Sequence, residues 1–103
     1  ASTGLPKSAT LANSEAKVCA AAIGAIMQGD PVDDPVYINA CYSLIAPEYG
    51  ISVATMYEVK EGRVAQIENA SGTSPLGVNQ KYRSKEAKDA HGWYASIVAD
   101  TFG

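Results

Sequence analysis

The side chains of this sequence best suited to chemistry are its two cysteines, Cys19 and Cys41, and its single histidine, His91. A cysteine beside a histidine can form a reactive thiolate pair, so either cysteine with His91 is a candidate for nucleophilic chemistry. Both cysteines fall in strongly apolar segments, however, and buried structural thiols are usually inert. We therefore predict no catalytic residues. We expect His91 to be a surface or helix-interface residue.

The two cysteines can also join each other, because the sequence has no third cysteine. A disulfide is typical of oxidising compartments and stabilises a small domain, so we predict a bridge between Cys19 and Cys41. Strand alternation places Cys41 on the less apolar face. The bridge then needs a bulge near Asn39 or Ala40, or a sheet covered on both faces. The alternative is two free thiols packed as small hydrophobic side chains.

Metal and cofactor sites have little support in the sequence. Asp30, Asp33 and Asp34 lie in a turn bounded by prolines, and their carboxylates could bind a hard cation. Their spacing is not that of an EF-hand, so we expect a solvated turn and no metal. The glycines form no phosphate-binding loop between a strand and a helix, so we expect no nucleotide cofactor.

Tyrosine is frequent in this chain, with six residues in total. Four of them, Tyr37, Tyr42, Tyr49 and Tyr57, lie on or beside the first two predicted strands. Tyrosine combines an apolar ring with a polar hydroxyl and is common in binding surfaces. We predict that these four form an interaction surface; the alternative is that they pack beneath the helices.

Composition indicates one folded domain over residues 1–103, with 47% hydrophobic and 18% charged residues. The net charge is −3, and the basic residues are scattered along the chain, so we expect no nucleic-acid partner. The longest apolar run, residues 18–27, is about half the roughly 20 residues needed to cross a bilayer. We therefore expect no membrane span.

The first expected element is a helix over residues 14–28, after an extended segment over residues 1–12. Asn13 or Ser14 would cap its beginning, and Gly29 would end it. Helical spacing then predicts one buried stripe on this helix, formed by Cys19, Ala22, Ile23, Ile26 and Met27.

Alternating apolar residues predict strands over residues 36–45 and 51–60. A tight turn at Glu61 and Gly62 then leads into a third strand over residues 63–69. Residues 78–83 could add a short edge strand.

The last element is a helix capped by Ser84. Its apolar stripe comprises Ala90, Trp93, Tyr94, Ile97, Val98, Thr101 and Phe102, and its outer face comprises Lys85, Glu86, Lys88 and Asp89. The fold class is therefore α+β in two layers, with an N-terminal helix, a three- to four-stranded antiparallel meander and a C-terminal helix.

The expected function follows from the first residues and from the tyrosines. The sequence begins at Ala1 with small polar residues, as after a signal-peptidase site, so we expect a secreted or periplasmic protein; a chain trimmed at a domain edge is the alternative. We predict a non-enzymatic domain of the inhibitor, immunity or envelope-accessory type, which binds a protein or, alternatively, a glycan.

Two other functions stay open at this point. One is a small enzyme or ligand carrier with a pocket between helix and sheet, using His91 with a cysteine or a carboxylate. The other is a homodimer formed through an open edge of the sheet.

Overall fold

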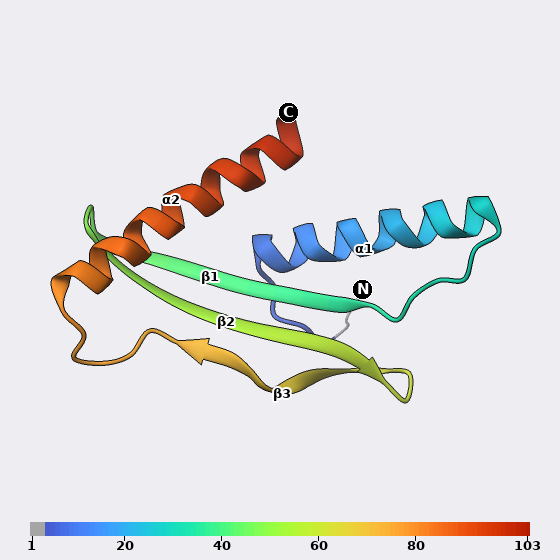
Figure 1. The fold of residues 1–103 in the computed structure, drawn as a ribbon, viewed down its shortest axis with the longest axis horizontal. Helices are drawn as coiled ribbons and strands as arrows, with labels where there is room; N and C mark the ends of the chain where they lie inside the picture. The colour runs from blue at the N-terminus through green and yellow to red at the C-terminus, as the bar shows by residue number, and fades with distance from the viewer. Residues whose placement is uncertain (1–3) are drawn as a thin grey trace. The chain divides into compact units, whose positions relative to one another are not determined.

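The computed structural model describes residues 4–103, which form two helices and three strands (Figure 1). The elements in chain order are α1 (Ala9–Gln28), β1 (Val36–Ala46), β2 (Tyr49–Lys60), β3 (Arg63–Thr73) and α2 (Gln80–Phe102). The strands pair in the order β1-β2-β3. The predicted α+β class, with a helix before and after a three-stranded antiparallel sheet, is confirmed. Residues 1–3 of the predicted extended segment lie outside the described residues.

The turn between β2 and β3 is the predicted one. Glu61 and Gly62 both have positive φ angles, 53° and 73°. Two such residues in a two-residue connection match the right-handed twist of the strands that they join. The sequence therefore identified this hairpin correctly.

The chain divides into two compact units, and the strands contribute to both. The α1 unit consists of Ala1–Asn39 and Thr55–Ser71, and so contains α1, the beginning of β1, the end of β2 and most of β3. The α2 unit consists of Ala40–Ala54 and Gly72–Gly103, and contains the rest of the strands and α2.

In the α1 unit, the helix begins earlier than predicted, at Ala9. The Ser8 hydroxyl accepts a hydrogen bond from the Leu11 amide at 3.1 Å and donates to Asn39 Oδ1 at 2.5 Å. Leu11 is only 1% exposed. Residues 9–12 are therefore helical rather than extended, because this first turn is anchored on β1. Ser14, a predicted cap, accepts a hydrogen bond from the Ile38 amide at 3.1 Å instead.

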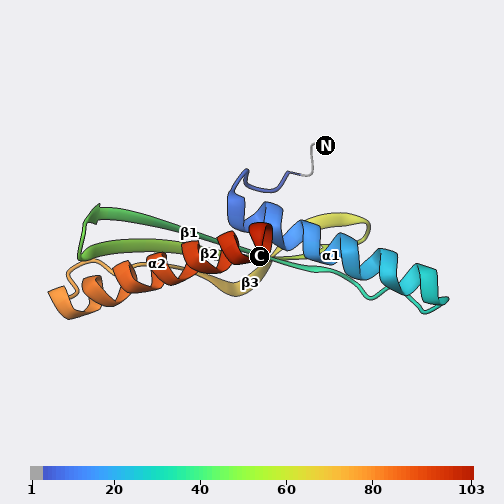
Figure 2. The same cartoon turned by 90° about the horizontal axis from the view of Figure 1, so that it is seen from above.

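The predicted buried stripe of α1 is wrong. Cys19, Ile23, Ile26 and Met27 are all exposed, and only Ala22 is half-buried. Burial on this helix comes from Leu11 in its first turns. The helix does end where the sequence predicts, at Gly29 with φ 75°, and residues 29–35 then lead back to the start of β1 (Figure 2).

In the α2 unit, the second helix begins at Gln80, so residues 80–83 are helical and the predicted edge strand is absent there. Asn79 is the cap, because its side chain accepts a hydrogen bond from the Tyr82 amide at 3.0 Å. Ser84 does not cap the helix. It donates to the Glu48 carbonyl oxygen at 3.3 Å, and Gln80 Nε2 donates to the same oxygen at 2.9 Å.

The buried side of α2 shares only Ala90 with the predicted stripe. It consists of Arg83, Glu86, Ala87 and Ala90, whereas Tyr94 and Phe102 are exposed. A Cβ atom added at Gly50 would lie 2.5 Å from the Ala87 amide nitrogen, so the backbones of β2 and α2 are in direct contact. The expectation that Glu86 is exposed is therefore wrong, because the close approach of the strand encloses it.

Farther along α2, Trp93 is half-buried and contacts Tyr42 of β1, with ring centroids 6.1 Å apart. Aromatic pairs at this separation add favourable packing energy. Neither helix, as far as residues 4–103 are concerned, is long and apolar enough to cross a membrane.

Candidate functional site

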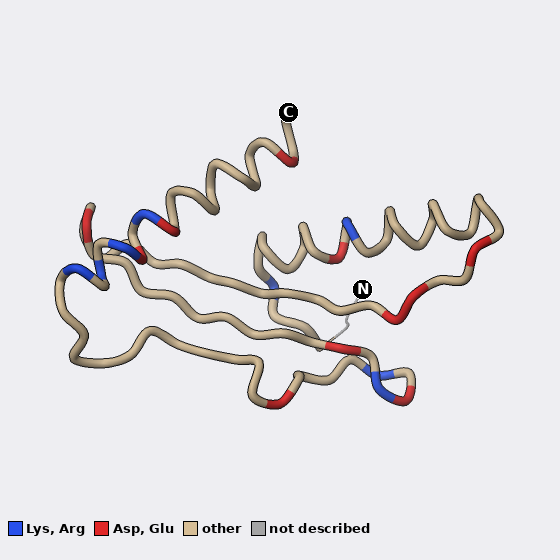
Figure 3. The backbone as a smooth tube through the Cα atoms, viewed as in Figure 1, with Lys and Arg blue, Asp and Glu red and all other residues tan. Residues whose placement is uncertain are grey.

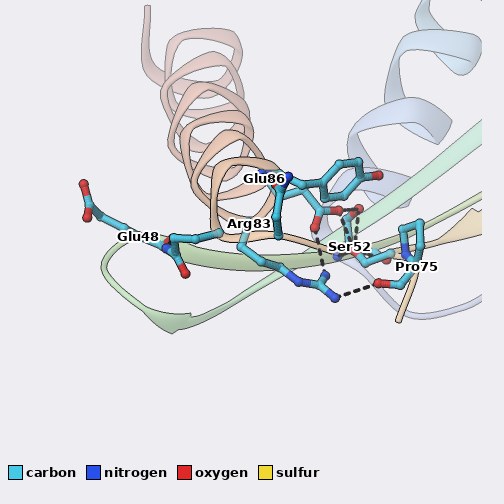
Figure 4. A network of polar contacts seen from close by, with 9 residues as sticks. Glu48, Ser52, Pro75, Arg83 and Glu86 are labelled. Carbon is cyan, nitrogen blue, oxygen red and sulfur yellow. Dashed lines mark hydrogen bonds and ion pairs between the residues drawn. The ribbon is translucent and has the colours of Figure 1, made fainter. Parts of the chain in front are cut away.

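The most enclosed polar cluster of the α2 unit surrounds the Glu86 carboxylate (Figure 4). The Ser52 hydroxyl donates to Glu86 Oε1 at 2.9 Å, and the Ser74 hydroxyl donates to the same oxygen. Arg83 donates from one terminal nitrogen to Glu86 Oε2 at 3.1 Å. These three donors come from β2, the segment after β3, and α2, so the carboxylate joins three parts of the unit.

The same contacts determine the protonation of Glu86. Burial by itself raises the pKa of this carboxyl group. Hydrogen bonds from Ser74, Ser52 and Arg83, together with the charge of Arg83, outweigh burial and bring the pKa below its ordinary value of 4.5. Glu86 is therefore a fixed negative partner for Arg83 at neutral pH.

Arg83 is unusually buried for an arginine, because only 5% of its side chain is exposed. Besides its bond to Glu86, it donates to the Pro75 carbonyl oxygen at 2.6 Å, and its guanidinium carbon lies 5.3 Å from the centre of the Tyr49 ring. Its Nε atom is buried and has no hydrogen-bond partner in the described part of the chain. A buried donor without an acceptor is unfavourable unless a ligand supplies one.

A cavity of about 300 Å³ lies against this cluster, and we call it the Cys41 pocket. Its walls combine the Cys41 thiol, four hydroxyl side chains, three apolar side chains and Arg83. They are formed by Cys41, Ser43, Ile51, Ser52, Val53, Thr73, Ser74, Leu76 and Arg83. An apolar cavity with a few polar groups is typical of a small-molecule site.

The α1 unit has a second hollow of about 500 Å³, formed by α1 and residues 31–37. Its walls include Cys19, several alanines of α1, and the acidic residues Glu15, Asp33 and Asp34. The segment from Gly29 to Pro35 carries acidic residues and no basic one (Figure 3). Within residues 4–103, no group of three or more His, Cys, Asp or Glu side chains is arranged to hold a metal ion.

The cysteines singled out from the sequence lie in different units, Cys19 in the α1 unit and Cys41 in the α2 unit. Both carry thiols in the structure, and the disulfide between them stays a prediction. The expected burial is wrong for Cys19, which is exposed, while Cys41 is half-buried. His91 is exposed on α2 and does not line the Cys41 pocket, so the structure does not unite it with Cys41 there.

The four tyrosines of the predicted interaction surface are also divided between the units. Tyr37 and Tyr57 belong to the α1 unit and are half-buried. Tyr42 contacts Trp93, and Tyr49, 37% exposed, lies over Arg83. Binding through these tyrosines stays a prediction.

The sequence reasoning missed four residues of this site: Ser52, Ser74, Arg83 and Glu86. Arg83 and Glu86 are three residues apart on a helix, a spacing that allows an ion pair but also occurs on exposed faces. The two serines come from distant segments. Only the folded chain shows that all four converge.

One protein family matches this chain over residues 33–102, which includes the strands, the Cys41 pocket and all of α2. The description of this family is "Flavocytochrome c sulphide dehydrogenase, flavin-binding". The prediction of a non-enzymatic binding domain is therefore wrong, because the match indicates a flavin-binding part of an oxidoreductase. The sequence offered no nucleotide-binding motif that would have indicated a flavin. Since the match covers about two thirds of the sequence, this chain belongs to the flavin-binding family of flavocytochrome c sulphide dehydrogenase.

Proposed function

We propose that this chain forms part of the flavin site of a sulphide-oxidising enzyme, and that the Cys41 pocket faces the flavin. The observation that supports this most strongly is the position of the pocket. All nine residues of its lining fall within residues 33–102, the region that matches the flavin-binding family. The groove lined by Cys19 includes residues of α1, which lies outside that region.

The lining of the pocket fits the ring system of a flavin better than its phosphates. Ile51, Val53 and Leu76 offer apolar contact to a flat ring, and the Ser43 and Thr73 hydroxyls can hydrogen-bond to its polar edge. The phosphates of a dinucleotide are usually held by a Gly-rich turn between a strand and a helix. Residues 4–103 contain no such turn, so we assign to this chain the ring side of the site only.

Cys41 is the residue of the pocket that can react with sulphide. Joining its sulfur to that of hydrosulphide makes one S–S bond and releases one proton and two electrons. A flavin, when bound, would supply the acceptor for those two electrons. In this scheme the sulfur atom of hydrosulphide stays bonded to Cys41 when the two electrons are released.

We extend the proposal to the location of the protein. Flavocytochrome c sulphide dehydrogenase is periplasmic in bacteria, which supports the periplasmic alternative expected from the sequence.

The experiment is a test of whether flavin protects Cys41. The chain is treated with iodoacetamide while FAD is increased, and the labelling of each cysteine is followed by mass spectrometry of its peptide. We expect FAD to slow the labelling of Cys41 in proportion to the flavin bound, and to leave Cys19 unaffected. Quenching of the flavin fluorescence shows that the protein has bound FAD. If Cys41 is then labelled equally fast with and without FAD, the proposed site is refuted.

A further inference from the structure

The hollow of about 500 Å³ between α1 and residues 31–37 has mostly apolar walls, and we call it the Cys19 groove. Valine, alanine and proline side chains form most of its lining, and all of that lining belongs to the α1 unit. Val32 and Val36 in its wall are 50% and 45% exposed, and Cys19 is exposed as well. The groove therefore presents apolar side chains to solvent.

The apolar surface continues along α1 beyond the groove. Ile23 follows Cys19 by four residues and Ile26 follows Ala22 by four, so helical spacing places both isoleucines on the side of the groove. They are 53% and 67% exposed. A contiguous exposed apolar surface usually marks a site of protein or membrane interaction. A small ligand would fill the groove and leave the two isoleucines uncovered, so a longer occupant fits this surface better.

The charges of the Cys19 groove indicate which kind of occupant it accepts. Its lining includes Glu15, Asp33 and Asp34 and has no lysine or arginine. Within the described part of the chain, none of these three carboxylates belongs to an ion pair. They would repel an anionic membrane surface, and they would repel the same groove of a second copy. Lysine or arginine side chains of a partner would be attracted.

We infer that the Cys19 groove binds a basic amphipathic helix of a partner protein. The apolar face of that helix would lie between α1 and residues 31–37 and extend over Ile23 and Ile26, while its flanking basic residues meet the carboxylates. Apolar grooves commonly bind amphipathic helices in this way, whereas an extended peptide adds to the edge of a sheet. The inference goes beyond the proposed function, because the flavin is assigned to the Cys41 pocket of the other unit.

The test uses two synthetic peptides that share a leucine face and differ in charge, LKKLLKLLKKLLKL and LEELLELLEELLEL. Each is added to wild-type protein without flavin, and iodoacetamide labelling of each cysteine is followed by mass spectrometry. We expect the lysine peptide to slow labelling of Cys19 in a saturable way and to leave Cys41 unaffected. The glutamate peptide should protect neither cysteine. Equal protection of Cys19 by both peptides, or by neither, would overturn the inference.

A pair of double variants tests the charges of the groove. Asp33→Asn with Asp34→Asn removes two carboxylates from the lining. The matched control, Glu61→Gln with Glu68→Gln, makes the same change in net charge at exposed positions of the α1 unit outside the groove. We expect the first variant to raise the peptide concentration for half-maximal protection by about fivefold, the size of two exposed ion pairs. An equal rise in the control would show that the peptide responds only to net charge.

A second pair of variants tests the apolar surface. Ile26→Ser on α1 is compared with Ile45→Ser on β1, because the two isoleucines are similarly exposed, at 67% and 64%. We expect Ile26→Ser to weaken peptide binding by about tenfold, since one apolar side chain is no longer buried by the peptide, and Ile45→Ser to have no effect. Equal binding by both variants would contradict the inferred site. Sedimentation of a dimer in which Cys19 is protected without peptide would assign the groove to a second copy instead.

These experiments contain no flavin and report on Cys19, whereas the test of the flavin site reports on Cys41. Failure of the groove is therefore distinguishable from failure of the proposed function.

Discussion

The α1 unit and the α2 unit both anchor a helix on strands through a buried polar group, but they use different chemistry. In the α1 unit, the neutral Asn39 amide accepts from Ser8 and donates to Thr55 Oγ1 at 3.4 Å. In the α2 unit, the anchor is the ion pair of Arg83 and Glu86, supported by two serines. A neutral amide can be fully satisfied within the fold. The arginine, by contrast, keeps one buried donor, its Nε–H, without an acceptor among residues 4–103, and it shares the wall of a pocket with the half-buried Cys41 thiol.

The two units also differ in how closely helix and strand approach. Gly50 allows direct backbone contact with α2, whereas a Cβ atom at Gly24 of α1 would meet nothing within 4 Å. Close contact is what excludes water from Glu86 and Arg83. The comparison teaches that the buried ion pair of the α2 unit depends on tight packing of helix against strand, whereas much of α1 stays exposed.

The largest expected effect is the loss of one partner from the ion pair of the α2 unit. Arg83→Met leaves the Glu86 carboxylate buried without its cation, which should lower the free energy of unfolding by about 3–5 kcal/mol. Urea unfolding followed by fluorescence of Trp93 measures this, because the only tryptophan lies in the α2 unit. Lys81→Met is the control, since it removes an exposed cation from the same helix. Equal urea midpoints for both variants would contradict the assigned role.

The next largest effect contrasts two glycines. Gly50→Ala forces a methyl group against the α2 backbone and should destabilise the α2 unit by about 1–3 kcal/mol. Gly24→Ala adds a methyl group to open space in a helix interior and should stabilise α1 by roughly 0.5–1 kcal/mol. Urea unfolding by circular dichroism checks the sign of both changes. If both substitutions shift the midpoint in the same direction, the contrast between the units is wrong.

A smaller effect is expected from the neutral anchor. Asn39→Ala removes the partner of the Ser8 and Thr55 hydroxyls and should lower the free energy of unfolding by about 1–2 kcal/mol. The same urea experiment applies, with circular dichroism as the readout because Asn39 belongs to the α1 unit. A loss as large as that of Arg83→Met would remove the proposed distinction between neutral and ionic anchors.

The smallest effect concerns acid stability. The pKa of Glu86 is lower in the folded chain than its ordinary value of 4.5, so the folded state binds a proton less readily than the unfolded state. Its contribution is therefore complete above about pH 4.5 and is lost as the pH falls through the lower folded value. We expect urea midpoints to fall less steeply between pH 5 and 3 in Glu86→Gln than in the wild type. A steeper fall in the variant would reverse the sign of this coupling.

The sequence predicted the parts of the fold that depend on local patterns. The hairpin at Glu61 and Gly62 and the end of α1 at Gly29 follow from turn and cap chemistry. Both helices begin earlier than predicted. Ser8 caps α1 and is held by a hydrogen bond to Asn39, 31 residues away. Asn79 rather than Ser84 caps α2. Local spacing cannot choose between such caps when a distant partner decides.

The candidate site was predicted only in part. Cys41 was identified from the sequence as a residue that could react, but the residues that surround it were not identified. Glu86 has the sequence character of an exposed helix residue, and it is buried only because Ser52, Ser74 and Arg83 satisfy its oxygens. The flavin could not be predicted from the residues, because no Gly-rich phosphate-binding turn between a strand and a helix occurs within residues 4–103.

The most direct test of the central claim is reduction of the flavin by sulphide, followed by absorbance in a stopped-flow instrument. In flavin-loaded protein, we predict rapid bleaching in the wild type and in Cys19→Ser, and none in Cys41→Ser, although dithionite still reduces the flavin in all three. Bleaching of Cys41→Ser by sulphide at the wild-type rate would contradict the assignment of Cys41 and its pocket to sulphide oxidation.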